Sequence, residues 1–276
     1  MSETIYSSQS PLGTPRAFLR QLRADAGASY RIVGQLFVRN LKIQARQSLL
    51  GYAWLLLPPL AAGLVWIVLG RAGVMRGAPV GIPYPAFVLA GVFLWQSFVE
   101  ALNCPLQQLG NQRATLAKVR VPHEAFVAAG GLVVAFNGLL RLGVLLGVVA
   151  WFGVPFTGAL LLVPLGGALL LVLGLGLGWL VALLGLLYAD VSQALTIGLN
   201  MWFLITPIVY QPPAGMAHWL RFNPVTPLLT TTRHWLLAGP VAPEPGFWLV
   251  AAGAGIIFIG NWLAYRLAQP HLVARL

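Results

Sequence analysis

The chain has 276 residues, of which 58% are hydrophobic and only 8% are charged, and its formal net charge is +11 at pH 7. Soluble domains typically carry about 25% charged residues, so this composition excludes an ordinary soluble domain and predicts an integral membrane protein. The basic residues lie mostly beside apolar segments, where anionic lipid headgroups attract them. We therefore attribute the positive charge to membrane lipids and expect no nucleic acid partner.

Residues 1–48 precede the first apolar run and form a predicted cytoplasmic or interfacial arm, distinct from a transmembrane domain at 49–276. Within the arm, residues 29–46 place polar side chains at steps of three or four: Arg31, Gln35, Arg39, Lys42 and Arg46. Apolar side chains occupy another face, which predicts an amphipathic helix lying in the cytoplasmic interface. Two interpretations stay open: a lipid anchor, or a lever that contacts a cytoplasmic partner.

The rest of the chain consists mainly of long apolar runs. A hydrocarbon core about 30 Å thick needs roughly 20 apolar residues in a helix. We predict an all-α protein with six transmembrane helices, at residues 49–70, 85–105, 125–152, 157–187, 195–211 and 245–267. Because the runs are continuously apolar, a β-barrel is disfavoured. The fourth run is long, so we expect it to tilt or to begin with an interfacial turn near Pro164.

The basic residues also predict the orientation. Twelve of the 17 Lys and Arg residues lie in the arm, in the loop between the second and third spans, or in the tail. Because such residues concentrate on the cytoplasmic side, both termini are expected there.

Two charges lie inside predicted spans, Glu100 in the second and Arg141 in the third. An uncompensated charge at the bilayer centre costs about 2.5–3.5 kcal/mol on insertion scales. The two spans form a hairpin, and the rise per residue puts the two charges at depths within about one helical turn of each other. We predict that they pair or share a water-filled cavity; independent snorkelling is the alternative.

Two connecting segments have unusual composition. The loop at 111–124 is polar and basic, and Pro122 ends a helix-compatible centre, which predicts a short cytoplasmic helix. The link at 212–244 is rich in Trp, Leu and Pro. We expect it to form short extracytoplasmic helices that re-enter the membrane edge, where irregular backbone must face protein or water. The folded-back link would help to form a path through the membrane, near which Trp202, Phe203 and Tyr210 would lie. The alternative is that these aromatic residues belong to an ordinary interfacial belt.

Several motifs occur in an order that resembles ABC-2 type permeases of polysaccharide export, which transport O-antigen, capsule or teichoic acid. They are "LLGYAWLLLPPL", "GIPYPAFVLAGVFLWQSF", "LAKVRVPHEAF", "YADVSQ", "FLITPIVYQPP" and "FNPVTPLLTTTRHWLLAG". The similarity runs from about residue 30 to residue 270. Ala189, His123 and Thr206 depart from the residues usual in these motifs.

The resemblance implies a homodimer of permeases with a path between them, driven by two copies of a separate ABC ATPase that binds ATP and Mg²⁺. The chain has no GxxxxGK[ST] phosphate-binding loop and is not expected to be an enzyme or to hold a cofactor or metal. The cargo would be a lipid-linked polysaccharide crossing the bacterial inner membrane; a small hydrophobic compound or drug is the alternative.

Three groups of functional residues follow from the resemblance. The substrate path is assigned to Tyr52, Trp54, Trp202, Phe203 and Tyr210. Coupling to the ATPase is assigned to the loop at 111–124, namely Arg113, Lys118, Arg120, Pro122, His123 and Glu124. The pyrophosphate of the lipid carrier would meet basic residues at the inner entrance, namely Arg39, Lys42 and Arg46.

Overall fold

The computed structural model describes residues 32–45, 51–73, 79, 81–111, 123–212, 215, 217–220, 222–237, 239 and 241–273. Every regular element within these ranges is a helix. Five of the described helices are long and apolar enough to cross a membrane: α2 (Ala53–Arg71), α3 (Tyr84–Asn111), α5 (His123–Trp151), η2 with α6 (Gly158–Gly185), and α10 (Phe247–Val273), of which Phe247–Gln269 is the apolar part. The expectation of an all-helical integral membrane protein is confirmed.

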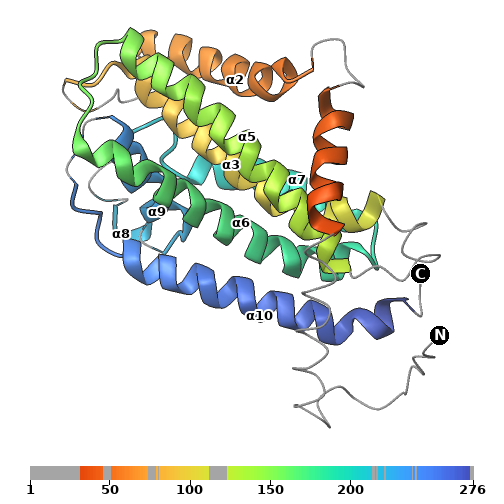
Figure 1. Ribbon diagram of the computed structural model, residues 1–276. Helices are drawn as coiled ribbons and strands as arrows, with labels where there is room; N and C mark the ends of the chain where they lie inside the picture. The colour runs from red at the N-terminus through yellow and green to blue at the C-terminus, as the bar shows by residue number, and fades with distance from the viewer. Residues whose placement is uncertain are drawn as a thin grey trace.

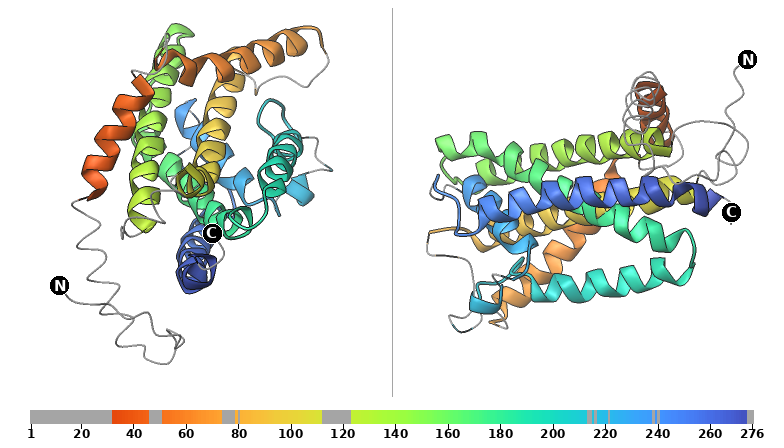
Figure 2. Two further views of the ribbon diagram at one scale, coloured as in Figure 1. Left: turned by 90° about the vertical axis from the view of Figure 1, so that its right-hand side faces the viewer. Right: turned by 90° about the horizontal axis from the view of Figure 1, so that it is seen from below.

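Helix α3 lies at the centre of the bundle and packs against α2, α5, α6 and α9 (Val225–Leu236) (Figure 1). Residues 86–95 of α3 are all buried, whichever side of the helix they occupy. A helix that is apolar all round is stable only when other elements surround it, which is the position α3 takes in the end-on view of Figure 2.

The fourth predicted span begins with a separate short turn, as expected near Pro164. A 3-10 helix, η2 (Gly158–Leu162), leads into α6 (Val163–Gly185), and Pro164 lies in the first turn of α6. Proline is well accommodated there because the first backbone N–H groups of a helix have no intrahelical acceptor.

The predicted boundaries of the span at 195–211 differ from those of the observed helix α7 (Asp190–Ile205), which has 16 residues. The helix begins earlier because Asp190 in its first turn interacts favourably with the helix dipole. It ends at Ile205 because Thr206 takes an extended backbone conformation, as a residue before proline prefers. In Figure 2, the axis of α7 lies roughly parallel to the axes of α5 and α10.

Residues 32–45 form a helix that lies across one end of the bundle, nearly perpendicular to the long helices (Figures 1 and 2). Its buried residue Leu36, together with Ile32 and Val33, packs against Ala125 and Phe126 at the start of α5. Arg39 and Lys42 are exposed.

Helix α9 has only 12 residues, yet all of them except His234 are buried. It contacts α3, α6 and α10 as well as η2. A four-residue helix, α8 (Ala217–Leu220), precedes it. The chain between α7 and α10 therefore folds back against the bundle.

Candidate functional site

The last turns of α7 are attached to α3 through aromatic side chains. The ring of Trp202 lies edge-on to Trp95 and Phe98, with centroids 6.1 and 5.4 Å away. The ring centroid of Phe203 lies 5.9 Å from that of Trp95 and 5.8 Å from that of Trp66 on α2. Both α7 residues are half-buried, so the structure brings these two predicted path residues together. Aromatic pairs at such distances add about 0.5–1.5 kcal/mol each beyond their buried area.

Asn223 connects the end of α7 to the start of α9. Its Oδ1 accepts hydrogen bonds from Trp202 Nε1 at 3.0 Å and from the backbone N–H of Val225 at 3.1 Å. Its Nδ2 donates to Thr206 Oγ1 at 2.9 Å. Asn223 was not assigned a role from the sequence, although the Asn-Pro step before an apolar segment is a typical helix-start signal.

Tyr210 is half-buried, and its hydroxyl turns back onto α7. The hydroxyl donates toward the carbonyl of Ile205 at 3.0 Å and that of Leu204 at 3.3 Å, two of the carbonyls that a helix end leaves unpaired. Burial raises the pKa of Tyr210, so the phenol is neutral. Its hydroxyl is therefore engaged within the protein.

Arg233 of α9 is buried, and sequence reasoning assigned it no functional role. Its Nη1 donates to the backbone carbonyls of Pro207 at 3.0 Å and Ile208 at 2.8 Å. The guanidinium carbon lies 3.8 Å from the centroid of the Phe87 ring on α3. Burial lowers the pKa of Arg233 to about 9, an effect that the nearby Glu244 opposes, so the side chain is charged at neutral pH.

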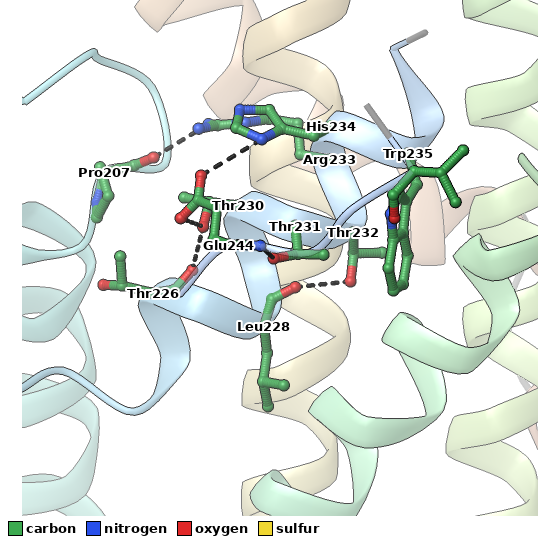
Figure 3. Close-up of polar contacts among 11 residues, drawn as sticks. Pro207, Thr226, Leu228, Thr230, Thr231, Thr232, Arg233, His234, Trp235 and Glu244 are labelled. Carbon is green, nitrogen blue, oxygen red and sulfur yellow. Dashed lines mark hydrogen bonds and ion pairs between the residues drawn. The ribbon is translucent and has the colours of Figure 1, made fainter. Parts of the chain in front are cut away.

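Glu244, just before α10, is held against α9 by several polar contacts (Figure 3). Its carboxylate accepts a hydrogen bond from Thr230 Oγ1 at 2.7 Å and lies 3.3 Å from His234 Nδ1, and its backbone N–H donates to Thr231 Oγ1. Burial lowers the pKa of His234. Trp235 is buried and donates to the carbonyl of Val241 at 2.9 Å, so it belongs to the core.

Glu100 and Arg141 form an ion pair, with 2.5 Å between Glu100 Oε2 and Arg141 Nη1. Asn137 donates to Glu100 Oε1 at 2.6 Å, and Arg141 donates to Ser97 Oγ at 3.3 Å. Gln44 donates to Asn137 Oδ1 at 3.5 Å, so this network includes the helix at 32–45. The prediction that the two intramembrane charges pair is confirmed.

Tyr52 and Trp54 lie at the opposite end of α2 from Trp66, roughly 20 Å away along the helix axis. The Tyr52 hydroxyl reaches the carbonyl of Leu41 at 3.4 Å, and its ring meets Phe136 of α5 at 6.0 Å. The side chain of Trp54 is exposed. The structure therefore does not bring these two residues together with the aromatic cluster of α7.

Of the residues assigned to coupling, the structure describes His123 and Glu124, and both contact α10. His123 Nδ1 lies 2.9 Å from the Tyr265 hydroxyl, and Glu124 forms an ion pair with Arg266 at 3.3 Å. Arg113, Lys118, Arg120 and Pro122 lie outside the described residues, and so does Arg46 of the predicted entrance group.

Comparison with known proteins gave no match to a family model. The chain is 25% identical over 201 residues to an O-antigen export system permease protein RfbA of Myxococcus xanthus, covering 71% of this chain and 76% of the relative. It is 22% identical over 261 residues to a protein of the same name from Klebsiella pneumoniae, covering 90% of this chain and 98% of the relative. A second Klebsiella pneumoniae protein of this name is 22% identical over 258 residues. These similarities confirm the resemblance to polysaccharide export permeases.

Proposed function

We propose that this chain is the membrane-spanning permease subunit of an ABC exporter that moves a lipid-linked, O-antigen-like polysaccharide out of the cytoplasm. The observation that carries the proposal is similarity to O-antigen export permeases over nine-tenths of the chain. The relatives' names favour a polysaccharide cargo over the alternative of a small hydrophobic compound or drug.

The proposed topology has six crossings of a bacterial inner membrane, with both termini in the cytoplasm. Helix α7 would be the fifth crossing, supported by its alignment with α5 and α10 in Figure 2. Helix α9 would re-enter from the outer side, because its 12 residues give a length of about 18 Å, too short for a core about 30 Å thick. Its burial against α3 and α6 supports this arrangement.

The proposed assembly contains two permeases and two copies of a separate ATPase, in which ATP and Mg²⁺ bind. The segment at 111–124 would contact the ATPase. The contacts of His123 and Glu124 with α10 support this role, because a displacement of the segment would be transmitted through them to α10.

The proposed path for the glycan passes Trp202, Phe203 and the ring of Tyr210. Their faces offer flat apolar contact to the C–H groups of pyranose rings without fixing a register, which suits a polymer that must move. Tyr52 and Trp54 would serve the same path nearer the inner side. The exposed Arg39 and Lys42, together with Arg46, would attract the pyrophosphate of the lipid carrier at the entrance.

The test is reconstitution of the chain and its partner ATPase in vesicles, with lipid-linked polysaccharide added. We expect ATP-dependent appearance of glycan on the opposite side and stimulation of ATP hydrolysis by the glycan. Trp202→Ala should lower glycan transport several-fold and leave basal ATP hydrolysis unchanged, because stacking contacts are worth about 1 kcal/mol each. Trp151→Ala is the matched control, since Trp151 is exposed at the end of α5. Transport that is equal in the two variants would remove Trp202 from the path.

A further inference from the structure

The turn that follows α7, residues 206–210, is held by side chains from two other helices. Three consecutive carbonyls of the turn each accept a hydrogen bond: those of Pro207 and Ile208 from Arg233 of α9, and that of Val209 from the Tyr84 hydroxyl of α3 at 3.2 Å. Residues 206–209 are buried. Buried carbonyls without a donor are costly, so these contacts are required for the turn to stay in this position.

The packing of α3 adds a second constraint on the same turn. A Cβ atom added to Gly91 would collide with the backbone carbonyl of Ile208, so the turn lies directly on the surface of α3 at this glycine. Arg233 reaches the same turn from α9, and its guanidinium rests on Phe87 of α3. The turn is therefore in contact with both α3 and α9.

The aromatic residues of the path are attached to this turn. Thr206 Oγ1 donates to the carbonyl of Trp202 at 2.8 Å, and Asn223 bridges Thr206 and Trp202. Tyr210, at the other end of the turn, caps α7. A displacement of the turn would therefore move Trp202 and Tyr210 relative to α3.

We infer that Arg233 is a positioning residue for export: by holding the carbonyls of Pro207 and Ile208, it fixes the outer end of α7 and, through it, the aromatic side chains that contact the glycan. The contact with the glycan rests on the proposed function, whereas the attachment of the turn does not. Arg233 itself does not need to touch the cargo. Its chemistry suits this role because a guanidinium offers several N–H donors in one plane and stacks on aromatic faces, which a lysine ammonium does not reproduce.

The first test measures the turn itself. Amide hydrogen exchange is followed by mass spectrometry in the purified, full-length protein and in Arg233→Met. We expect faster exchange across residues 201–212 and unchanged exchange in α6. Arg71→Met is the matched control, because Arg71 is an exposed arginine in the last turn of α2. Unchanged exchange across 201–212 in Arg233→Met would overturn the inference.

The second test measures export per assembled complex, so that a loss of folded protein is not counted as a loss of transport. The export rate of Arg233→Met should be lower by about tenfold or more. The substitution removes two hydrogen bonds from a charged donor, and such bonds stabilise more than neutral ones. Basal ATP hydrolysis should be unchanged, and Arg233→Lys should recover part of the export. Wild-type export in a variant with faster exchange would refute the positioning role.

If Arg233→Met does not accumulate in the membrane, Tyr84→Phe gives the same test with a smaller change. It removes the hydrogen bond to Val209, together with the longer one from the same hydroxyl to the carbonyl of Trp66, and keeps the ring. It should show the same localised increase in exchange and a smaller loss of export; no change in either would contradict the inference. Failure of the wild-type complex to export lipid-linked polysaccharide would instead refute the proposed function, and the exchange measurement would still decide whether Arg233 holds the turn.

Discussion

Two buried arginines among the described residues are accommodated in different ways. Arg141 is paired with the carboxylate of Glu100, whereas Arg233 donates to two backbone carbonyls and stacks on Phe87. Both solutions satisfy the requirement that a charge within an apolar environment be paired or hydrogen-bonded. An ion pair brings two charges out of water, and removing one partner leaves the other uncompensated.

Exchanging the charges of this ion pair tests its importance. Glu100→Arg and Arg141→Glu, each alone, should lower stability by about 3–5 kcal/mol, because each places two like charges in a buried site. The double exchange should recover part of the loss. The readouts are the thermal stability of the purified protein and export per complex. Equal damage in all three variants would contradict a direct pairing.

The difference between these two arginines also shows what sequence reasoning found and what it missed. Glu100 and Arg141 were matched from sequence because a hairpin of two helices with a fixed rise places them at similar depths. The partners of Arg233 are carbonyls of a turn about 25 residues away, and every residue has a carbonyl. No residue type or spacing reports such a contact. Asn223 was missed for a related reason, since its role depends on where α7 ends.

At the scale of the helices, close packing of α6 on α3 depends on glycine. Helix α6 is so rich in glycine that its sequence does not tell which glycines are required, and the structure distinguishes them. A Cβ atom on Gly178 would collide with the carbonyl of Leu102, and one on Gly174 would lie 2.8 Å from the carbonyl of Phe98. Gly167 has nothing within 4 Å. Small residues allow such close approach of helices in membranes.

Substituting these glycines gives a matched comparison within one helix. Gly178→Ala should destabilise the protein by about 1–3 kcal/mol, because the neighbouring atom is backbone and cannot rotate away. Gly167→Ala should be neutral or slightly stabilising, since alanine is the better helix former by about 1 kcal/mol. Thermal unfolding in detergent measures both. A similar effect of the two substitutions would show that α3 and α6 are not in close contact at Gly178.

Helix boundaries were predicted less accurately than helix positions. The five long spans were recognised because a continuous apolar run of about 20 residues, in a chain with so few charges, has the length and polarity of a membrane-crossing helix. The end of α7 was placed six residues too late, at 211, because residues 206–210 are apolar but not helical. Their burial comes from contacts with α3 and α9, so hydropathy alone could not separate them from a span.

For the whole molecule, the described ends of the chain lie at the same end of the bundle. The helix at 32–45 and the C-terminal end of α10 are both on that side in Figure 1. This agrees with the proposed topology, in which an even number of crossings returns the chain to the cytoplasm. It also places the exposed Arg39 and Lys42 on the side where the contacts between α5 and α10 are found.

Labelling of single cysteines tests this orientation. In a Cys104→Ser background, cysteines at Lys42 and at Trp219 should differ in their reaction with a membrane-impermeant maleimide added to intact cells. We expect labelling at position 219 and none at position 42 until the membrane is permeabilised, because the reagent reaches only the outer face. Labelling of position 42 in intact cells would reverse the proposed orientation.

Helix α9 has consequences for how the protein is made. Its twelve residues include four threonines, an arginine and a histidine, a composition too polar to partition directly into lipid as it leaves the ribosome. Helices α3 and α6, against which α9 packs, are synthesised earlier, but Glu244, which contacts Thr230, Thr231 and His234 of α9, is synthesised later. The contacts of α9 with Glu244 can therefore form only after the chain has been translated beyond this residue. A nascent chain that stops before Glu244 would lack these contacts.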